Sequence, residues 1–182
     1  MKKIALAVAL SALFVQQTNA MDVQPYVGGD YIYSWADVKP EKYIEDNYHS
    51  LSISAGVMTS SVVGIELSYQ LSEQNKKTTS AGQTKFEYKA LALDGAYYMS
   101  LNDNIQGIGT LGLGYYDINA KVKSGGVLDH DDDEHFGLRF GAGLQYSIDS
   151  NWAVRMMARY HYIDAKRLHH ITDITAGVRY YF

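Results

Sequence analysis

Five acidic residues and two histidines lie within one eight-residue stretch, LDHDDDEH, from Leu128 to His135. Carboxylates and imidazoles are competent ligands for divalent cations, so the stretch is a candidate metal site. A calcium loop of the EF-hand kind needs spaced ligands and a central glycine, which three adjacent aspartates do not supply. Two interpretations stay open: a solvated charge cluster, which we favour, and loose cation binding by Asp129, His130, Asp131 and His135.

A second group of residues could support nucleophilic catalysis. His161, His169 and His170 follow one another closely, with Asp164 and Asp173 nearby. Such chemistry needs a nucleophile and a base within hydrogen-bond reach, oriented by a third group. The sequence places no serine beside these histidines, and interfacial or loop histidines are the simpler interpretation. We therefore assign no catalytic residue, cofactor site or metal site, and expect that the chain is not an enzyme.

The first twenty residues have the composition of an export signal. Lys2 and Lys3 precede an apolar run from Ile4 to Val15, and small residues follow at Thr18 and Ala20. This order is typical of a secretory signal peptide, and the apolar run is too short to span a bilayer as a helix. We expect cleavage after Ala20, leaving a single domain over residues 21–182.

The charge balance and the lack of cysteine exclude several classes of function. Removal of Lys2 and Lys3 leaves 14 of the 16 basic residues against 20 acidic ones, a net charge of −6. This balance disfavours nucleic acid as a partner, because such binders carry a basic stripe. The chain has no cysteine, which excludes disulfides, thiolate zinc sites and a lipid-anchoring cysteine.

Alternating apolar and polar residues predict strands along the rest of the chain. Eight such segments are expected, at residues 24–35, 48–58, 62–72, 85–101, 105–118, 134–148, 152–164 and 172–182. Tight turns at 59–61, 102–104 and 149–151 alternate with longer polar connectors at 36–47, 73–84, 119–133 and 165–171. This pattern predicts an all-β fold, an eight-stranded antiparallel up-and-down barrel.

The two faces of these strands distinguish a soluble barrel from a transmembrane one. In a soluble barrel the apolar face would turn inward around a small-molecule pocket. Aromatic residues instead cluster at strand ends of the apolar face, as membrane interfaces require: Trp35, Tyr69, Trp152, Tyr162, Tyr180 and Phe182. The polar face carries four acids and four arginines, which predicts an ion-pair network in the lumen of a transmembrane barrel: Asp30, Glu66, Asp94, Asp173, Arg139, Arg155, Arg159 and Arg179.

One strand departs from this pattern. Lys85, Glu87 and Lys89 share the parity of Leu91 and Leu93, which belong to the apolar face. Either these charges stand above the bilayer, or a β-bulge switches the two faces at this point.

The C-terminal sequence TAGVRYYF resembles the assembly signal of bacterial outer-membrane barrels through Thr175, Gly177, Tyr180 and Phe182. With the export signal and eight strands, the chain looks like a small barrel of the OmpA, OmpX and opacity-protein type. The resemblance implies the outer membrane of a Gram-negative bacterium, with membrane lipid and lipopolysaccharide around the barrel. It also implies recognition of the last strand by the barrel-assembly machinery, and a barrel without the periplasmic domain of full-length OmpA.

An eight-stranded barrel has an interior that side chains can fill, so we expect a closed lumen and a monomeric barrel. The predicted function is structural or surface interaction, in adhesion or envelope integrity, through four extracellular loops that contact a host or cell-surface ligand. The alternatives are a small passive channel and a lipid-modifying enzyme. The acidic run then belongs to the longest loop, where it could bridge to lipopolysaccharide phosphates through a divalent cation.

Overall fold

The computed structural model describes residues 23–38, 47–72, 75–79, 82–124, 127–163 and 168–182, and within them it contains nine strands. The strands are β1 (Gln24–Val38), β2 (Asn47–Met58), β3 (Val63–Ser72), β4 (Asn75–Thr79), β5 (Gly82–Ser100), β6 (Ile105–Ser124), β7 (Val127–Ser147), β8 (Trp152–Ile163) and β9 (Leu168–Tyr181). Among these residues no helix is long and apolar enough to cross a membrane.

The sheet closes on itself into a barrel of antiparallel strands. The strands follow the order β3-β2-β1-β9-β8-β7-β6-β5-β4, and an additional pairing between β3 and β5 completes the ring. β3 pairs with the lower part of β5 up to Leu71 opposite Lys89, and β4 pairs with the same strand from Asn75 opposite Phe86. β3 and β4 thus share one position in the wall, and the predicted eight-stranded barrel is confirmed.

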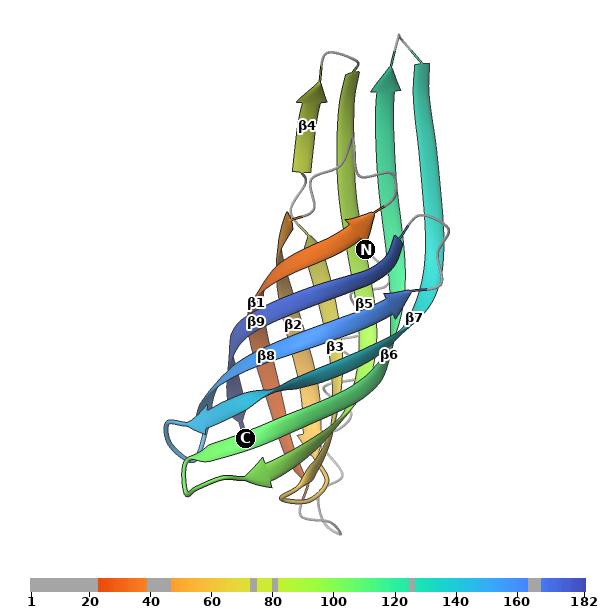
Figure 1. Cartoon of the computed structure of the whole chain (residues 1–182). Coiled ribbons are helices and arrows are strands. Elements are labelled where there is room, and N and C mark those ends of the chain that lie inside the picture. The colour runs from red at the N-terminus through yellow and green to blue at the C-terminus, as the bar shows by residue number, and fades with distance from the viewer. Residues whose placement is uncertain (1–22, 39–46, 73–74, 80–81, 125–126, 164–167) are drawn as a thin grey trace.

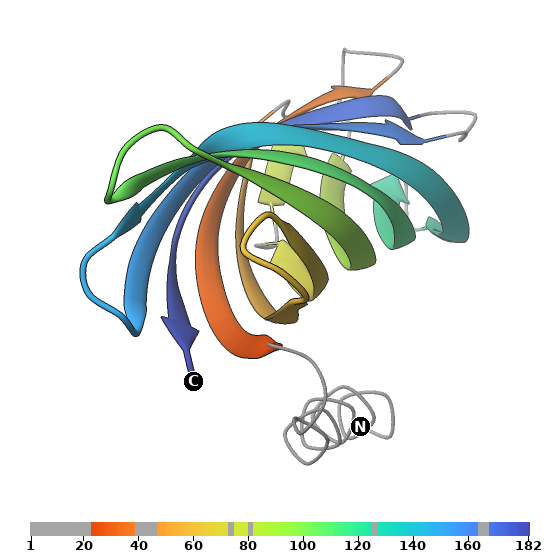
Figure 2. The same ribbon diagram turned by 90° about the horizontal axis from the view of Figure 1, so that it is seen from below.

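Three tight turns gather at one end of the barrel, together with the C-terminus (Figures 1 and 2). In one turn the side chain of Asn102 accepts hydrogen bonds from the backbone amides of Asn104 and Ile105, at 2.9 and 2.8 Å. In another, Asp149 accepts from Asn151 and Trp152, at 2.8 and 2.7 Å. Short polar side chains of this type accept hydrogen bonds from the backbone amides of a turn, so these residues predicted the turns correctly.

At the opposite end, two of the predicted loops are strand for most of their length. β5 begins at Gly82, β6 continues to Ser124, and β7 begins at Val127, so the prediction of loops over 73–84 and 119–133 is wrong. The backbone pairs in register from Ile118 opposite Asp133 to Ser124 opposite Val127. With β4, these strands form a four-stranded sheet that rises above the rest of the barrel (Figure 1). We call this part, residues 75–79, 82–88, 118–124 and 127–133, the sheet extension.

The pairing between β5 and β6 decides between the two explanations for the charged residues Lys85, Glu87 and Lys89, which share the parity of the apolar face. The register runs from Gln83 opposite Lys123 to Ser100 opposite Gln106 with no shift. A bulge does not switch the faces of β5. The backbone of Lys85 and Glu87 lies in the sheet extension, beyond the apolar part of the strand.

The wall has an apolar outside and a polar inside. Leu51, Ile53 and Met156 are each more than 60% exposed, although they lie within strands. The alternate positions are buried and include serines, carboxylates and arginines. A protein in water reverses this arrangement, so the exposed apolar surface is the one that faces lipid.

Candidate functional site in the barrel lumen

Eight charged side chains of the strands project into the lumen. Each is at most 4% exposed: Asp30, Glu66, Asp94, Asp173, Arg139, Arg155, Arg159 and Arg179. An isolated buried charge is very costly, so such groups persist only when they are paired. Their contacts divide into three groups along the barrel axis.

Glu66 of β3 is the centre of the largest group. Arg155 donates a hydrogen bond from Nη2 to Oε1 of Glu66 at 2.7 Å, and Arg179 donates from Nε to Oε2 at 3.3 Å. The Nη2 atom of Arg159 lies 3.7 Å from Oε1. Tyr26 also donates its hydroxyl to Oε2, at 3.0 Å. Three arginines from β8 and β9 therefore converge on one carboxylate from the opposite side of the ring.

Asp30 of β1 compensates the excess of positive charge at this centre. Arg179 donates from Nη2 to Oδ2 of Asp30 at 2.8 Å, and Nη2 of Arg155 lies 4.0 Å from the same oxygen. Ser52 donates its hydroxyl to that oxygen at 3.3 Å. Two carboxylates thus share three arginines, which links four strands, β1, β3, β8 and β9, through the interior.

Glycines leave the space for these long side chains. A Cβ atom at Gly28 would overlap the guanidinium of Arg179, and one at Gly177 would overlap the carboxylate of Asp30. The polar face alternates charged residues with glycine because the interior of a small barrel holds only a few large side chains in each layer.

Arg139 and Asp94 form a second, separate pair. Nη2 of Arg139 lies 3.4 Å from Oδ2 of Asp94, and its Nη1 donates to the hydroxyl of Ser68 at 3.4 Å. Gly112 lies beside this pair, where a Cβ atom would overlap Asp94. The pair connects β5 with β7.

Asp173 contacts a histidine rather than an arginine. Nε2 of His161 lies 3.0 Å from Oδ2 of Asp173, and the hydroxyl of Tyr116 forms a 2.7 Å hydrogen bond with Nδ1 of the same ring. His161 is 1% exposed, so the interpretation of this residue as an interfacial histidine is wrong. Its parity with Arg155 and Arg159 was the signal that could have identified it as a lumen residue.

This group does not have the geometry of a serine hydrolase. Among the described residues, Nδ1 of the His161 ring meets the Tyr116 hydroxyl and Nε2 meets the Asp173 carboxylate, so neither nitrogen faces a serine. A nucleophilic serine must instead contact the histidine directly. His170 stacks on Tyr160 at 5.6 Å on the outer face, away from His161, and the side chain of His169 lies outside the described residues, as does Asp164.

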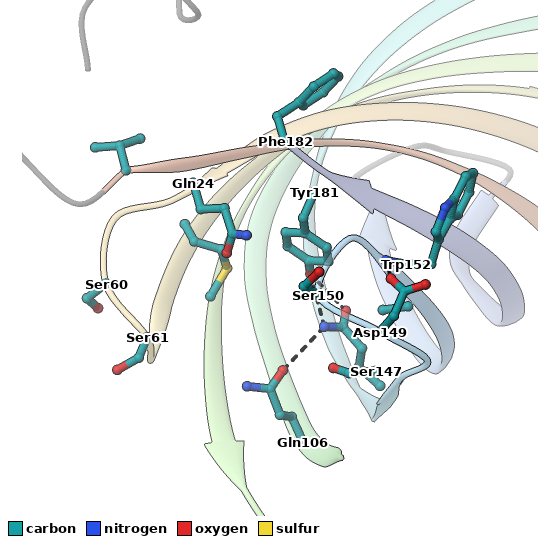
Figure 3. Close-up of a pocket in the computed structure, with 14 residues that line it drawn as sticks. Gln24, Ser60, Ser61, Gln106, Ser147, Asp149, Ser150, Trp152, Tyr181 and Phe182 are labelled. Carbon is teal, nitrogen blue, oxygen red and sulfur yellow. Dashed lines mark hydrogen bonds between the residues drawn. The ribbon is translucent and has the colours of Figure 1, made fainter. Parts of the chain in front are cut away.

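A layer of apolar side chains occupies the lumen below the charges, at the end with the tight turns. It consists of the buried residues Tyr26, Met58, Ala96, Tyr98, Ile108, Ala153, Met157 and Tyr181. Beneath it a shallow cavity of about 540 Å³ opens at the mouth of the barrel (Figure 3). There Gln145 donates to the hydroxyl of Tyr181 at 2.9 Å and to Gln106 at 3.3 Å. Met58, Ala153 and Tyr181 of this layer line the cavity.

Aromatic residues mark the two rims of the outer surface. Trp152 packs against Tyr180 at 4.9 Å, and Tyr180 against Phe182 at 5.1 Å, at the end with the tight turns. At the other end Trp35 packs edge-on against Tyr33 at 4.7 Å. These positions fit the two interfacial girdles of a transmembrane barrel.

The acidic run lies in β7 rather than in a loop. Its backbone pairs with β6, from Lys123 opposite Leu128 to Tyr116 opposite His135. The side chains of residues 128–133 lie outside the described residues, so cation binding there stays a prediction. Among the side chains that are described, no three histidines or acids cluster as a metal site would require.

Comparison with known proteins identifies the family. A family model described as "Outer membrane protein beta-barrel domain" matches residues 5–182. No curated protein sequence matches the chain.

Solved structures show the same fold. The chain resembles Neisserial surface protein A, with a TM-score of 0.67 and 22% identity over 87% of this chain and 97% of that one. It also resembles Ail, the attachment invasion locus protein of Yersinia pestis, with a TM-score of 0.61 and 17% identity over 88% and 97%. A major outer membrane protein of Thermus thermophilus gives a TM-score of 0.63 and 10% identity over 87% and 99%. A further structure holds Ail in complex with the heparin analogue sucrose octasulfate.

Proposed function

Because this chain belongs to the outer membrane β-barrel family, we propose that it is a closed, non-enzymatic barrel that presents surface segments for contact with other molecules. The observation that carries the proposal is the contrast between the filled lumen of the barrel and the sheet extension. Ion pairs and an apolar layer fill the lumen, and the sheet extension rises from the wall at the other end. The barrel closes within one chain, which supports a barrel that folds as a monomer.

The proposed orientation places the tight turns and both termini in the periplasm and the sheet extension outside the cell. A signal peptide over residues 1–20 would direct export, and outer-membrane lipid with lipopolysaccharide would surround the wall. The assembly machinery would read the last strand, where Tyr180 and Phe182 form the rim cluster and the amide of Phe182 bonds to Pro25. Thr175 and Gly177 complete that signal.

Conductance in planar bilayers tests whether the lumen is closed. We expect no steps of the size that a general porin gives, because the interior of an eight-stranded barrel is narrow enough for the arginine–carboxylate groups and the apolar layer to fill it. Met157→Gly combined with Tyr98→Ala, which shortens two side chains of the apolar layer, serves as a control that enlarges the lumen. Porin-sized conductance of the unmodified chain would contradict the proposal.

Binding assays on whole cells test the surface role. A deletion strain is compared with strains that carry the full chain or a variant in which β4 to β7 are shortened to the barrel rim. Loss of adhesion in the deletion and shortened strains alike would support surface interaction. Unchanged binding with altered envelope permeability would favour a purely structural role instead. Because Ail has been seen with a heparin analogue, sulfated polysaccharide belongs among the ligands tried.

A further inference from the structure

The upper part of β7 pairs with a strand on one side only in the part of the chain that the structure describes. β6 pairs with β7 over its full length, whereas the pairing with β8 begins at Gly137, opposite Ile163. Among the described residues, the segment Val127–Glu134 therefore has no second partner strand. A strand in this position presents a row of backbone donors and acceptors to another chain.

β4 forms the other edge of the same sheet extension. Asn75–Thr79 pairs with β5, and β4 is the last strand in the order of the sheet. Within the described part of the chain no strand lies on its outer side. As far as the described residues go, the sheet extension thus has two edges without a further partner strand, separated by β5 and β6 (Figure 1).

The sequences of these two edges carry opposite charges. The β7 edge contains Asp129, Asp131, Asp132, Asp133 and Glu134, and β4 contains Lys76 and Lys77. Like charges on an edge prevent two identical edges from pairing. Opposite charges on facing strands stabilise pairing. An acidic edge therefore excludes its own copy and favours a basic edge.

The two edges also match in height and direction. The register places Lys77, Thr84, Val122 and Asp129 in a single row across the four strands. β4 runs away from the barrel and β7 runs toward it. A bilayer holds neighbouring copies upright at one depth, so the β7 edge of one copy meets the β4 edge of the next at the same level and antiparallel.

We propose that copies of this chain associate side by side in the membrane, with the acidic edge of β7 in one copy paired to the basic edge of β4 in the next. Each copy keeps its own complete barrel, and only the sheet extension continues from one molecule to another. The contact joins two different surfaces, so it generates rings or rows rather than a symmetric dimer. The inference holds whichever side of the membrane carries the sheet extension, and it is independent of conductance and of ligand binding.

Disulfide cross-linking tests this arrangement, because the natural chain has no cysteine. Thr78 and Leu128 fall in one row of the register, through Gln83 and Lys123. The variants Thr78→Cys and Leu128→Cys are reconstituted separately and as an equal mixture in lipid vesicles, and then oxidised. We expect cross-linked dimers mainly in the mixture. Equal cross-linking in either variant alone, or none in the mixture, would overturn the proposal.

Charge reversal distinguishes cross-linking through the proposed pairing of the two edges from cross-linking by random collision of two chains. Lys76→Glu with Lys77→Glu in the Thr78→Cys chain should lower cross-linking to the Leu128→Cys chain by about fivefold, since the register places Lys77 opposite Asp129 and diagonal to Asp131, and both contacts become like-charge ones. Asp129→Lys with Asp131→Lys in the Leu128→Cys chain should restore it. Heat-modifiable gel migration of every variant confirms that the barrel has folded. If an added oligolysine peptide that carries one cysteine cross-links to Leu128→Cys while the second copy does not, the partner is a basic peptide and the proposal is wrong.

Discussion

The lumen and the sheet extension belong to the same continuous sheet, and they differ in how charge is distributed across the strands. In the lumen each arginine lies within 4.0 Å of a carboxylate, and the closed ring of strands leaves no open edge around it. In the sheet extension five acidic residues belong to the β7 edge and two lysines to the β4 edge, and the two inner strands carry Lys85, Glu87, Lys121 and Lys123. We infer that charges enclosed by the closed sheet pair within the chain, whereas charges on an edge strand are available to an external partner.

The largest effect should come from Glu66→Gln, because this change leaves three arginines around a neutral side chain. Removal of one member of a buried ion pair costs about 3 to 5 kcal/mol. We expect a loss of that size in the free energy of unfolding, measured by urea titration in lipid vesicles. The fluorescence of Trp35 and Trp152 reports the two rims of the barrel in this experiment.

Glu134→Gln is the matched control, since it makes the same chemical change at an exposed position of β7. It should alter the free energy of unfolding by less than about 0.5 kcal/mol. Raised salt should leave the Glu66 group unaffected, because buried pairs are screened little. Equal effects of the two substitutions would remove the distinction between lumen and surface charge.

A smaller effect is expected from Gly177→Ala, which tests how tightly the lumen is packed. The added methyl group would overlap Asp30 and the backbone oxygen of Gly29, and overpacking of this kind costs about 1 to 3 kcal/mol. Gly109→Ala is the control, because its Cβ would meet no atom within 4 Å. We expect the unfolding midpoint to fall for the first variant only. A parallel fall in both would mean that strand propensity, rather than space in the lumen, requires the glycines.

Tyr116→Phe should have a still smaller effect, because it removes one hydrogen-bonding hydroxyl and no charge. Nδ1 of His161 loses its 2.7 Å partner in a buried site, a change that costs about 1 kcal/mol. Tyr115→Phe makes the same change at the neighbouring position, which is less buried and lies on the other face of β6. Urea unfolding of both variants distinguishes the lumen contact from the general loss of a hydroxyl.

The closed barrel, and the identity of the residues that line its lumen, could be predicted from the alternation of apolar and polar residues alone. Strand parity identified Asp30, Glu66 and Arg155 as inward residues, because a period of two assigns each position to one face. Strand parity could not predict that Glu66 would contact three arginines, or that Asp173 would contact His161. Those pairings depend on the tilt and stagger of the strands, which no single strand encodes.

The sheet extension was missed for a different reason. Polar residues such as Lys85, Asp131 and Asp132 resemble a loop when strands are recognised by an apolar face. Above the membrane rim the wall has no lipid to face, so the apolar alternation stops although the backbone ladder continues. The length of a strand and the length of its apolar part are separate properties, and only the second is visible in the hydrophobic pattern.

The smallest expected effect on stability is that of Asp131→Asn with Asp132→Asn in the upper part of β7. Both residues lie outside the closed ring, so the free energy of unfolding of the barrel should change by less than about 0.5 kcal/mol. The same variant should lower cross-linking between Thr78→Cys and Leu128→Cys chains, since it removes two of the five charges of the acidic edge. Raised salt should weaken the cross-linking of the parent chains in the same direction. A loss of barrel stability without a change in association would place these charges with the lumen residues, as part of the fold rather than of a contact surface.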